Sequence, residues 1–175
     1  MKDYDYSLTG AYFITLCTQG KRNILCEIGP VGQGLCSCRL LAAGEIVQDE
    51  LSRLETRYDG MKIDKYVIMP NHLHMIVIID QPGERREQSP LACAKERPQP
   101  GGHVCPRPTV SDFVCGLKSI TTKQCNRTCG TTGKTLWQTG FHDHIIRGEA
   151  NYLRIWQYID ENPLKWAEDC YYSIR

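Results

Sequence analysis

The sequence predicts an α+β fold of the ferredoxin-like, split β-α-β type, in which an antiparallel sheet carries helices on one face and a C-terminal helix follows. Two observations support this fold class. Residues 66–79 read YVIMPNHLHMIVII, two apolar runs joined at a Pro-Asn pair, as is typical of an antiparallel hairpin. Segments 40–58 and 109–127 carry apolar residues at helical spacing, and predicted strands lie on both sides of each segment.

The first half of the chain supplies three predicted strands and one helix. Alternation of apolar and polar residues, rich in aromatic and β-branched side chains, predicts a strand over 10–19. A glycine-rich loop is expected over 20–38 and a helix over 40–58. Strands over 61–69 and 72–80 then form the hairpin.

The second half begins with an irregular segment rich in proline and glycine, at about 81–108. A second helix is expected next, with Thr109 as its N-cap and Asp112 in its first turn. A short strand over 143–147 leads into a third helix over 151–161. The order of elements completes the split β-α-β pattern.

The length and composition predict one domain over residues 1–175. Of these residues, 41% are apolar and 23% are charged, as in an ordinary globular protein. No apolar run reaches about 18 residues, and the N-terminus lacks a signal-peptide pattern, so a cytoplasmic protein with no membrane association is expected. The ten cysteines are interpreted mainly as reduced thiols that fill apolar space.

The overall charge does not indicate a nucleic-acid partner, because the formal net charge is only +1. The distribution is more informative. No acidic residue occurs between Phe113 and His142, whereas Lys118 and Lys123 fall in that stretch. A locally basic face is one interpretation, and an ordinary solvated face is the other.

A pair of histidines, His72 and His74, begins the second strand of the hairpin. Residues two apart on a strand project to the same face, so the two imidazoles form half of a metal site. The third helix offers Tyr158 and Asn162, which are four residues apart and share one helix face. The Asn162 amide oxygen is a candidate third ligand, and Tyr158 would stand one turn away from the ion.

This set of residues has a use in phosphodiester chemistry. A tyrosine can act as a nucleophile that forms a covalent intermediate, although its phenol is weak at neutral pH. A Mg²⁺ or Mn²⁺ ion on two histidines and an amide oxygen would neutralise the phosphate charge and orient the phosphorus for attack. The product would be a 5′-phosphotyrosine link and a free 3′-hydroxyl.

The segments PNHLH and LWQTGFHDHIIRGEANYLRIWQYIDENPLKW resemble those of HUH single-tyrosine transposases, and in particular of REP-associated tyrosine transposases. The resemblance implies that His72 and His74 are the metal-binding pair, that Tyr158 is the nucleophile, and that Asn162 completes the metal site. His142 stands where that family pattern has an aromatic residue.

The resemblance also implies partners and a cofactor. Enzymes of that family cleave and rejoin single-stranded DNA, often at the foot of a hairpin, with Mg²⁺ or Mn²⁺. Some of them are monomers and others are homodimers that share active sites, so a homodimer stays open for this chain. From charge and placement alone, Lys118, Lys123 and Arg147 are candidate DNA-phosphate contacts.

Two other classes of function stay open. The first is a metal-dependent phosphodiesterase that combines the His72–His74 pair with a second pair, His142 and His144, and activates water without a covalent link. The second is a non-catalytic binder of hairpin DNA that descends from a transposase. The complete set His72, His74, Tyr158 and Asn162 argues against a decayed site.

Overall fold

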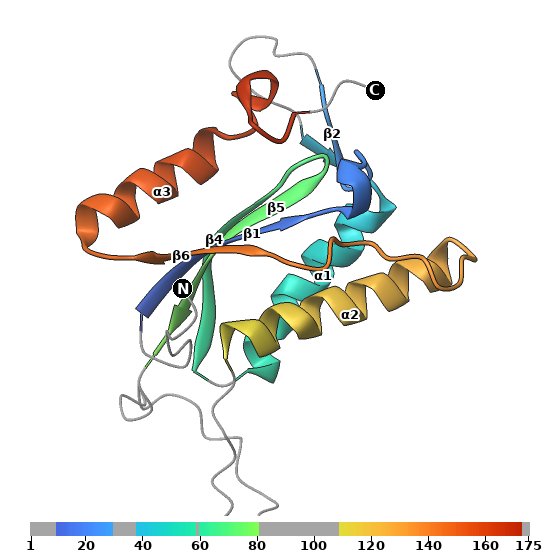
Figure 1. The fold of residues 1–175 in the computed structure, drawn as a ribbon, viewed down its shortest axis with the longest axis horizontal. Coiled ribbons are helices and arrows are strands. Elements are labelled where there is room, and N and C mark those ends of the chain that lie inside the picture. Colours follow the sequence, from blue (N-terminus) through green and yellow to red (C-terminus); the bar gives the residue numbers. More distant parts are fainter. Residues whose placement is uncertain (1–9, 30–37, 59, 81–108, 173–175) are drawn as a thin grey trace, which may run out of the picture.

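The computed structural model describes residues 10–29, 38–58, 60–80 and 109–172. Its centre is a four-stranded antiparallel sheet with the order β4-β5-β1-β6 (Figure 1). The strands are β1 (Gly10–Cys17), β4 (Met61–Ile68), β5 (His72–Ile79) and β6 (His142–Ile146). This is the ferredoxin-like arrangement that the sequence predicted, and the fold class is confirmed. The irregular segment expected at 81–108 lies outside the described residues.

One part of the expected loop over 20–38 is a small second sheet. A 3-10 turn (Gln19–Lys21) follows β1, and then β2 (Cys26–Ile28) pairs with β3 (Cys38–Leu40). Each of these strands has three residues, which is too short for an alternating pattern to be recognised in the sequence. The expectation of a continuous loop was therefore wrong at residues 26–28 and at residue 38.

Helices α1 (Ala42–Arg57) and α2 (Val110–Thr128) pack side by side on one face of the sheet. The α2 N-terminus is capped as predicted, because the Thr109 side chain accepts from the Asp112 backbone N–H and the Asp112 carboxylate accepts from the Thr109 backbone N–H. The main core lies between this helix layer and the sheet. Its largest fully buried side chains include Tyr12, Ile14, Leu51, Leu54, Leu73, Met75, Phe113 and Leu117.

Helix α3 (Glu149–Glu161) covers the opposite face of the sheet (Figure 1). Ile155 and Ile159, one turn apart, pack against Ile76 of β5 in a second apolar cluster. An ion pair of 2.6 Å between Lys65 of β4 and Asp160 fastens the same helix at its edge. Both faces of the sheet are therefore covered, and α3 lies over β4 and β5. A 3-10 turn (Trp166–Glu168) follows α3 and brings the C-terminal segment back over the hairpin.

None of the helices described has the length and apolar character that crossing a membrane requires.

The Ile159 contact predicts how firmly α3 is held. Ile159 is fully buried, so Ile159→Ala should lower the free energy of unfolding by about 2–4 kcal/mol through lost burial and a residual cavity. Leu153 on the same helix is 57% exposed, and Leu153→Ala should change the free energy of unfolding by less than about 0.5 kcal/mol. Urea denaturation of the two variants measures the difference. Equal losses would show that α3 is not anchored through Ile159.

Candidate metal and tyrosine site

Two histidines at the start of β5 project, almost fully buried, onto the sheet face that α3 covers. His72 and His74 are 0% and 1% exposed, and their ring centroids lie 4.4 Å apart. On the neighbouring strand β1 they lie opposite Cys17 and Thr15. The alternation of the strand thus places the two imidazoles side by side, as the sequence predicted.

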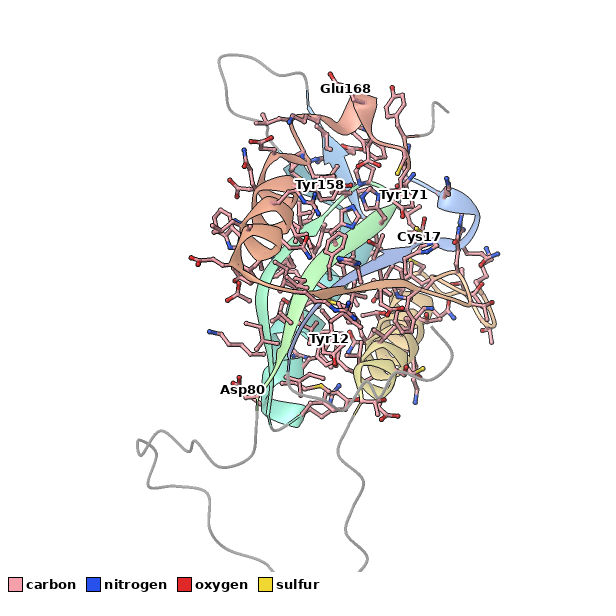
Figure 2. The ribbon with its side chains drawn as sticks, turned by 60° about the vertical axis from the view of Figure 1, so that its left-hand side comes forward. Tyr12, Cys17, Asp80, Tyr158, Glu168 and Tyr171 are labelled. Atoms are coloured by element: carbon pink, nitrogen blue, oxygen red, sulfur yellow. The ribbon has the colours of Figure 1, made fainter. Side chains whose placement is uncertain are left out.

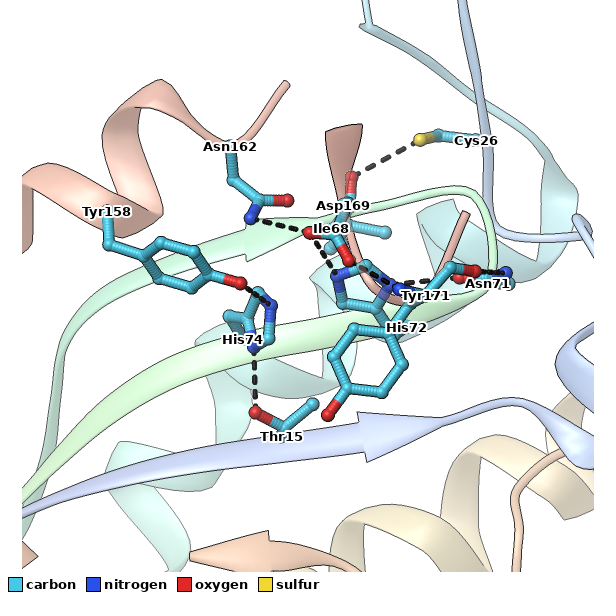
Figure 3. Close-up of polar contacts among 10 residues, drawn as sticks. All are labelled: Thr15, Cys26, Ile68, Asn71, His72, His74, Tyr158, Asn162, Asp169 and Tyr171. Atoms are coloured by element: carbon cyan, nitrogen blue, oxygen red, sulfur yellow. Dashed lines mark hydrogen bonds and ion pairs between the residues drawn. The ribbon is translucent and has the colours of Figure 1, made fainter. Parts of the chain in front are cut away.

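Each imidazole is oriented by a hydrogen bond at Nδ1 (Figure 3). His72 Nδ1 donates to Asn71 Oδ1 at 2.9 Å, and the Asn71 amide is itself fixed because its Nδ2 donates to the Tyr171 carbonyl at 2.8 Å. His74 Nδ1 bonds Thr15 Oγ1 at 2.8 Å. With the proton of His72 on Nδ1, its Nε2 presents a lone pair to the site. This is the arrangement that metal-binding histidines use.

The environment keeps both imidazoles neutral. Burial lowers the pKa of His72 to about 3, and the nearby positive charge of Lys21 acts in the same direction. Burial also lowers the pKa of His74 to about 3, with a further contribution from His72, while Asp169 acts in the opposite direction. Neutral imidazoles are the form that binds metal, so the pair is ready to ligate throughout the physiological pH range.

A carboxylate that the sequence reasoning missed, Asp169, completes the cluster. Its side chain is 2% exposed, and Asp169 Oδ2 lies 4.0 Å from His72 Nε2. One ligand atom from each of His72, His74 and Asp169 falls within 4.8 Å of the others. The carboxylate accepts hydrogen bonds from Asn162 Nδ2 at 2.9 Å and from the Tyr171 backbone N–H at 2.7 Å. Two imidazoles and a carboxylate form a donor set that suits a divalent ion.

No periodic signal in the sequence marks Asp169. It comes directly after the 3-10 turn Trp166–Glu168, in a segment for which the spacing of residues predicted no element. Only the return of this segment over the hairpin brings the carboxylate to the histidines. The position of this buried acid beside the histidines thus depends on the tertiary structure, which the spacing of residues in the sequence does not predict.

Asn162, predicted as the third ligand, does lie at the site and is 3% exposed. Its Nδ2 faces Asp169, and its Oδ1 is buried without a hydrogen-bond partner among the described residues. The Nε2 atom of His72 is buried in the same unpartnered state. Orphaned buried acceptors are costly, and a bound cation would satisfy them. The residues present therefore fit a metal ion, with Asn162 either as a ligand or as the group that orients Asp169.

Tyr158 lies on α3 (Figure 2), and its hydroxyl points toward His74 (Figure 3). Its hydroxyl lies 3.3 Å from His74 Nε2, and its ring packs edge-on against His74 and Phe13 at centroid distances of 5.3 and 6.1 Å. Burial raises the pKa of the phenol to about 12, and the negative charge of Asp169 adds to this, whereas a hydrogen bond from Asn162 acts in the opposite direction. The hydroxyl is therefore protonated at neutral pH unless a positive charge nearby lowers its pKa. At 41% exposure, the side chain is also open to a ligand.

The predicted DNA-phosphate contacts do not form one group. Lys118 and Lys123 line a cavity of about 890 Å³ between α2 and the segment that follows it. The Lys118 ammonium donates to the Thr139 and Gly140 carbonyls at 3.0 and 2.9 Å, so it also fastens α2 to that segment. Arg147 lies elsewhere, in the turn between β6 and α3.

The second histidine pair lies apart from the first. His142 and His144 are exposed on β6, opposite Thr15 and Phe13 of β1. Because β1 separates β6 from β5, two strand spacings of about 4.8 Å each lie between the two pairs. Within the described residues, the cluster able to hold an ion contains His72 and His74 but neither His142 nor His144.

Comparison with known proteins supplies a relative along almost the whole chain. An uncharacterized protein of Haemophilus influenzae is 32% identical over 173 residues, which cover 98% of this chain and 90% of that protein. The chain belongs to the family of this Haemophilus influenzae protein. No family model matches the sequence.

Among solved structures, the chain is similar to a REP-associated tyrosine transposase bound to a REP hairpin. The TM-score is 0.54 at 20% identity, and the match covers 95% of this chain and 74% of the transposase chain. The chain therefore has the fold of REP-associated tyrosine transposases, and the resemblance read from PNHLH and the C-terminal block is confirmed at the level of the fold.

The two candidate third ligands can be distinguished by Mn²⁺ binding. Asp169→Asn should weaken binding at least tenfold, because it removes the only negative charge of the cluster, and Asn162→Ala should weaken it less. The shift in melting temperature with Mn²⁺ concentration measures both effects, since saturation at 100 times Kd adds about 2.7 kcal/mol of stability. Glu168→Gln, next to Asp169 and exposed, is the matched control. A larger loss from Asn162→Ala than from Asp169→Asn would make the amide the third ligand.

Proposed function

We propose that the chain is a metal-dependent, single-stranded DNA endonuclease and strand transferase, a transposase that cleaves through a 5′-phosphotyrosine intermediate on Tyr158. One observation carries the proposal: the Tyr158 hydroxyl lies 3.3 Å from His74 Nε2, beside a buried cluster of two histidines and an aspartate. A nucleophile and an ion-binding group that meet at one point are what attack on a phosphodiester requires.

The metal site would be formed by His72, His74 and the oxygens of Asp169 or Asn162. Mg²⁺ or Mn²⁺ bound there would supply charge neutralisation of the phosphate and hold it in position. The Thr15 and Asn71 hydrogen bonds keep the two imidazoles in ligating orientation. The resemblance to REP-associated tyrosine transposases supports the same assignment of His72, His74, Tyr158 and Asn162.

In the proposed reaction, Tyr158 Oη attacks phosphorus and the bond from phosphorus to the 3′ oxygen breaks. The phenolic proton is released from Oη, and the departing 3′ oxygen gains a proton to become a hydroxyl. One phosphodiester is thus exchanged for one phosphotyrosine ester, with no loss of bond energy to water. The later attack of a 3′-hydroxyl on the phosphotyrosine would reverse the step and join a new strand.

The proposed substrate is single-stranded DNA next to a hairpin. The REP-associated transposase that shares the fold was solved with a REP hairpin, which supports a DNA partner of this kind. The cavity lined by Lys118 and Lys123 has no acidic residue in its lining and adds a basic surface. Arg147 adds a further positive charge near α3.

A homodimer is not needed for the chemistry, because the Tyr158 hydroxyl and the histidines belong to one chain.

The two other classes of function predict different products. A phosphodiesterase that uses His142 and His144 is less well supported, because that pair lies two strands from His72 and His74. A non-catalytic hairpin binder would have no use for a tyrosine hydroxyl beside a buried histidine pair.

The decisive experiment uses a hairpin oligonucleotide labelled at its 3′ end. The wild-type protein with Mn²⁺ should give a labelled protein–DNA adduct that survives denaturing electrophoresis, and EDTA should abolish it. Tyr158→Phe should reduce the adduct at least a thousandfold, because it removes the nucleophilic oxygen. Tyr172→Phe removes the hydroxyl of a tyrosine with the same 41% exposure and should leave adduct formation unchanged.

Other outcomes would reject the proposal. Cleavage without an adduct that persists in Tyr158→Phe would establish activated water as the nucleophile, as in the phosphodiesterase. Hairpin binding that is the same in EDTA and in Mn²⁺, with no cleavage in either, would establish the non-catalytic binder.

A further inference from the structure

A cavity of about 490 Å³ lies between α3 and the C-terminal turn, directly beside Tyr158. Tyr158, Asn162 and Asp169 line it next to the candidate metal site, and Gln157 and Arg154, which precede Tyr158 on α3, line it as well. The cavity therefore begins where the proposed chemistry occurs and extends along the helix toward its N-terminus. The proposed cleavage reaction assigns no role to the part of the cavity that extends along α3.

Three residues of the wall follow one ridge of α3. Arg154, Tyr158 and Asn162 are spaced by four residues, so their side chains follow each other along one face of the helix. Each step of four residues is slightly more than one turn, or about 6 Å along the axis. This is similar to the step between neighbouring phosphates of a single strand. A strand with its scissile phosphate at Tyr158 can thus present the next phosphate to Arg154.

The charges in the cavity single out Arg154. The lining holds three carboxylates, those of Glu161, Glu168 and Asp169. The Lys165 ammonium is already paired with Glu161 at 2.6 Å. Without a further cation, this wall would repel a phosphate.

The Arg154 guanidinium has capacity left for such a group. One Nη2 hydrogen bond goes to the neutral Asn151 Oδ1 at 2.9 Å. Among the described residues, no carboxylate lies within ion-pair distance of Arg154. A guanidinium has five N–H donors and binds phosphate in a bidentate manner, so Asn151 orients the group while most of its donors stay available.

We propose that this cavity holds the nucleotide next to the scissile bond, and that Arg154 binds the phosphate of that nucleotide. The inference rests on the proposed function, since it takes Tyr158 as the point of cleavage. Arg154 is then a substrate-positioning residue that sets the register of the strand. A metal ion held by His72, His74 and Asp169 would neutralise the scissile phosphate, and Arg154 binds the adjacent one.

The test measures binding without cleavage, in the full chain carrying Tyr158→Phe. The probe is a fluorescent DNA hairpin with single-stranded flanks, and its Kd is measured by anisotropy over a range of salt concentrations. Adding Arg154→Ala should weaken binding about tenfold and reduce the slope of log K against log salt by about 0.7, because one phosphate contact is lost. Arg154→Lys should keep the slope and recover only part of the affinity, because the charge stays and the bidentate geometry is lost.

A second measurement separates a direct contact from a structural effect. Methylphosphonate linkages, which are neutral, are placed one at a time along the flanks. One position should weaken binding to the protein that keeps Arg154, and the same position should cause no further loss in Arg154→Ala. Arg53→Ala, an exposed arginine of α1 on the opposite face of the sheet, should behave like the protein that keeps Arg154 at every position.

The outcomes separate the two proposals. An Arg154→Ala protein with unchanged affinity, salt slope and methylphosphonate profile overturns the role of Arg154, while the Tyr158 adduct still supports the transposase. Coupling between Arg154 and one linkage, together with a wild-type protein that forms no adduct, keeps the phosphate site and rejects the chemistry. A chain that binds no hairpin DNA overturns both.

Discussion

The burial of two neutral imidazoles side by side is the constraint on which the site depends. His72 and His74 lose almost all contact with water, and each is held at Nδ1 by Asn71 or Thr15. A buried polar group without a partner is costly, so the Nε2 atoms need an occupant or a donor. The Tyr158 hydroxyl fills that role for His74, at 3.3 Å. For His72 Nε2, the described residues offer only the distant carboxylate of Asp169.

The layering of the fold offsets the free-energy cost of burying the two histidines. The face of β5 that carries Leu73 and Met75 packs into the main core against α1 and α2, so the strand is rigid before the site is considered. The other face carries His72 and His74 and is closed by α3 through Ile76, Ile155 and Ile159. One strand therefore forms the wall of the core on one side and the floor of the candidate metal and tyrosine site on the other.

Local patterns were sufficient to predict the four strands of the main sheet, the hairpin and the helix that bears Tyr158, because each rests on neighbours within a few residues. The histidine pair was predictable for the same reason, since strand alternation fixes which face residues 72 and 74 share. Asp169 was not, because only the tertiary return of the C-terminal segment brings it to the pair. Lys118 was predicted from its charge as a DNA contact, and that prediction could not include the two carbonyls to which its ammonium donates.

The place of the histidines in the packing also bears on how such a chain diverges. Both imidazoles fill core volume as well as offering ligand atoms, so leucine or methionine at either position, matched by an apolar residue at Thr15, would keep the interior filled and remove a buried polar pair. Under the proposed function, selection for folding and selection for chemistry would therefore act on these positions in opposite directions. A chain that no longer needed the chemistry could lose both histidines and keep a stable protein of the same shape.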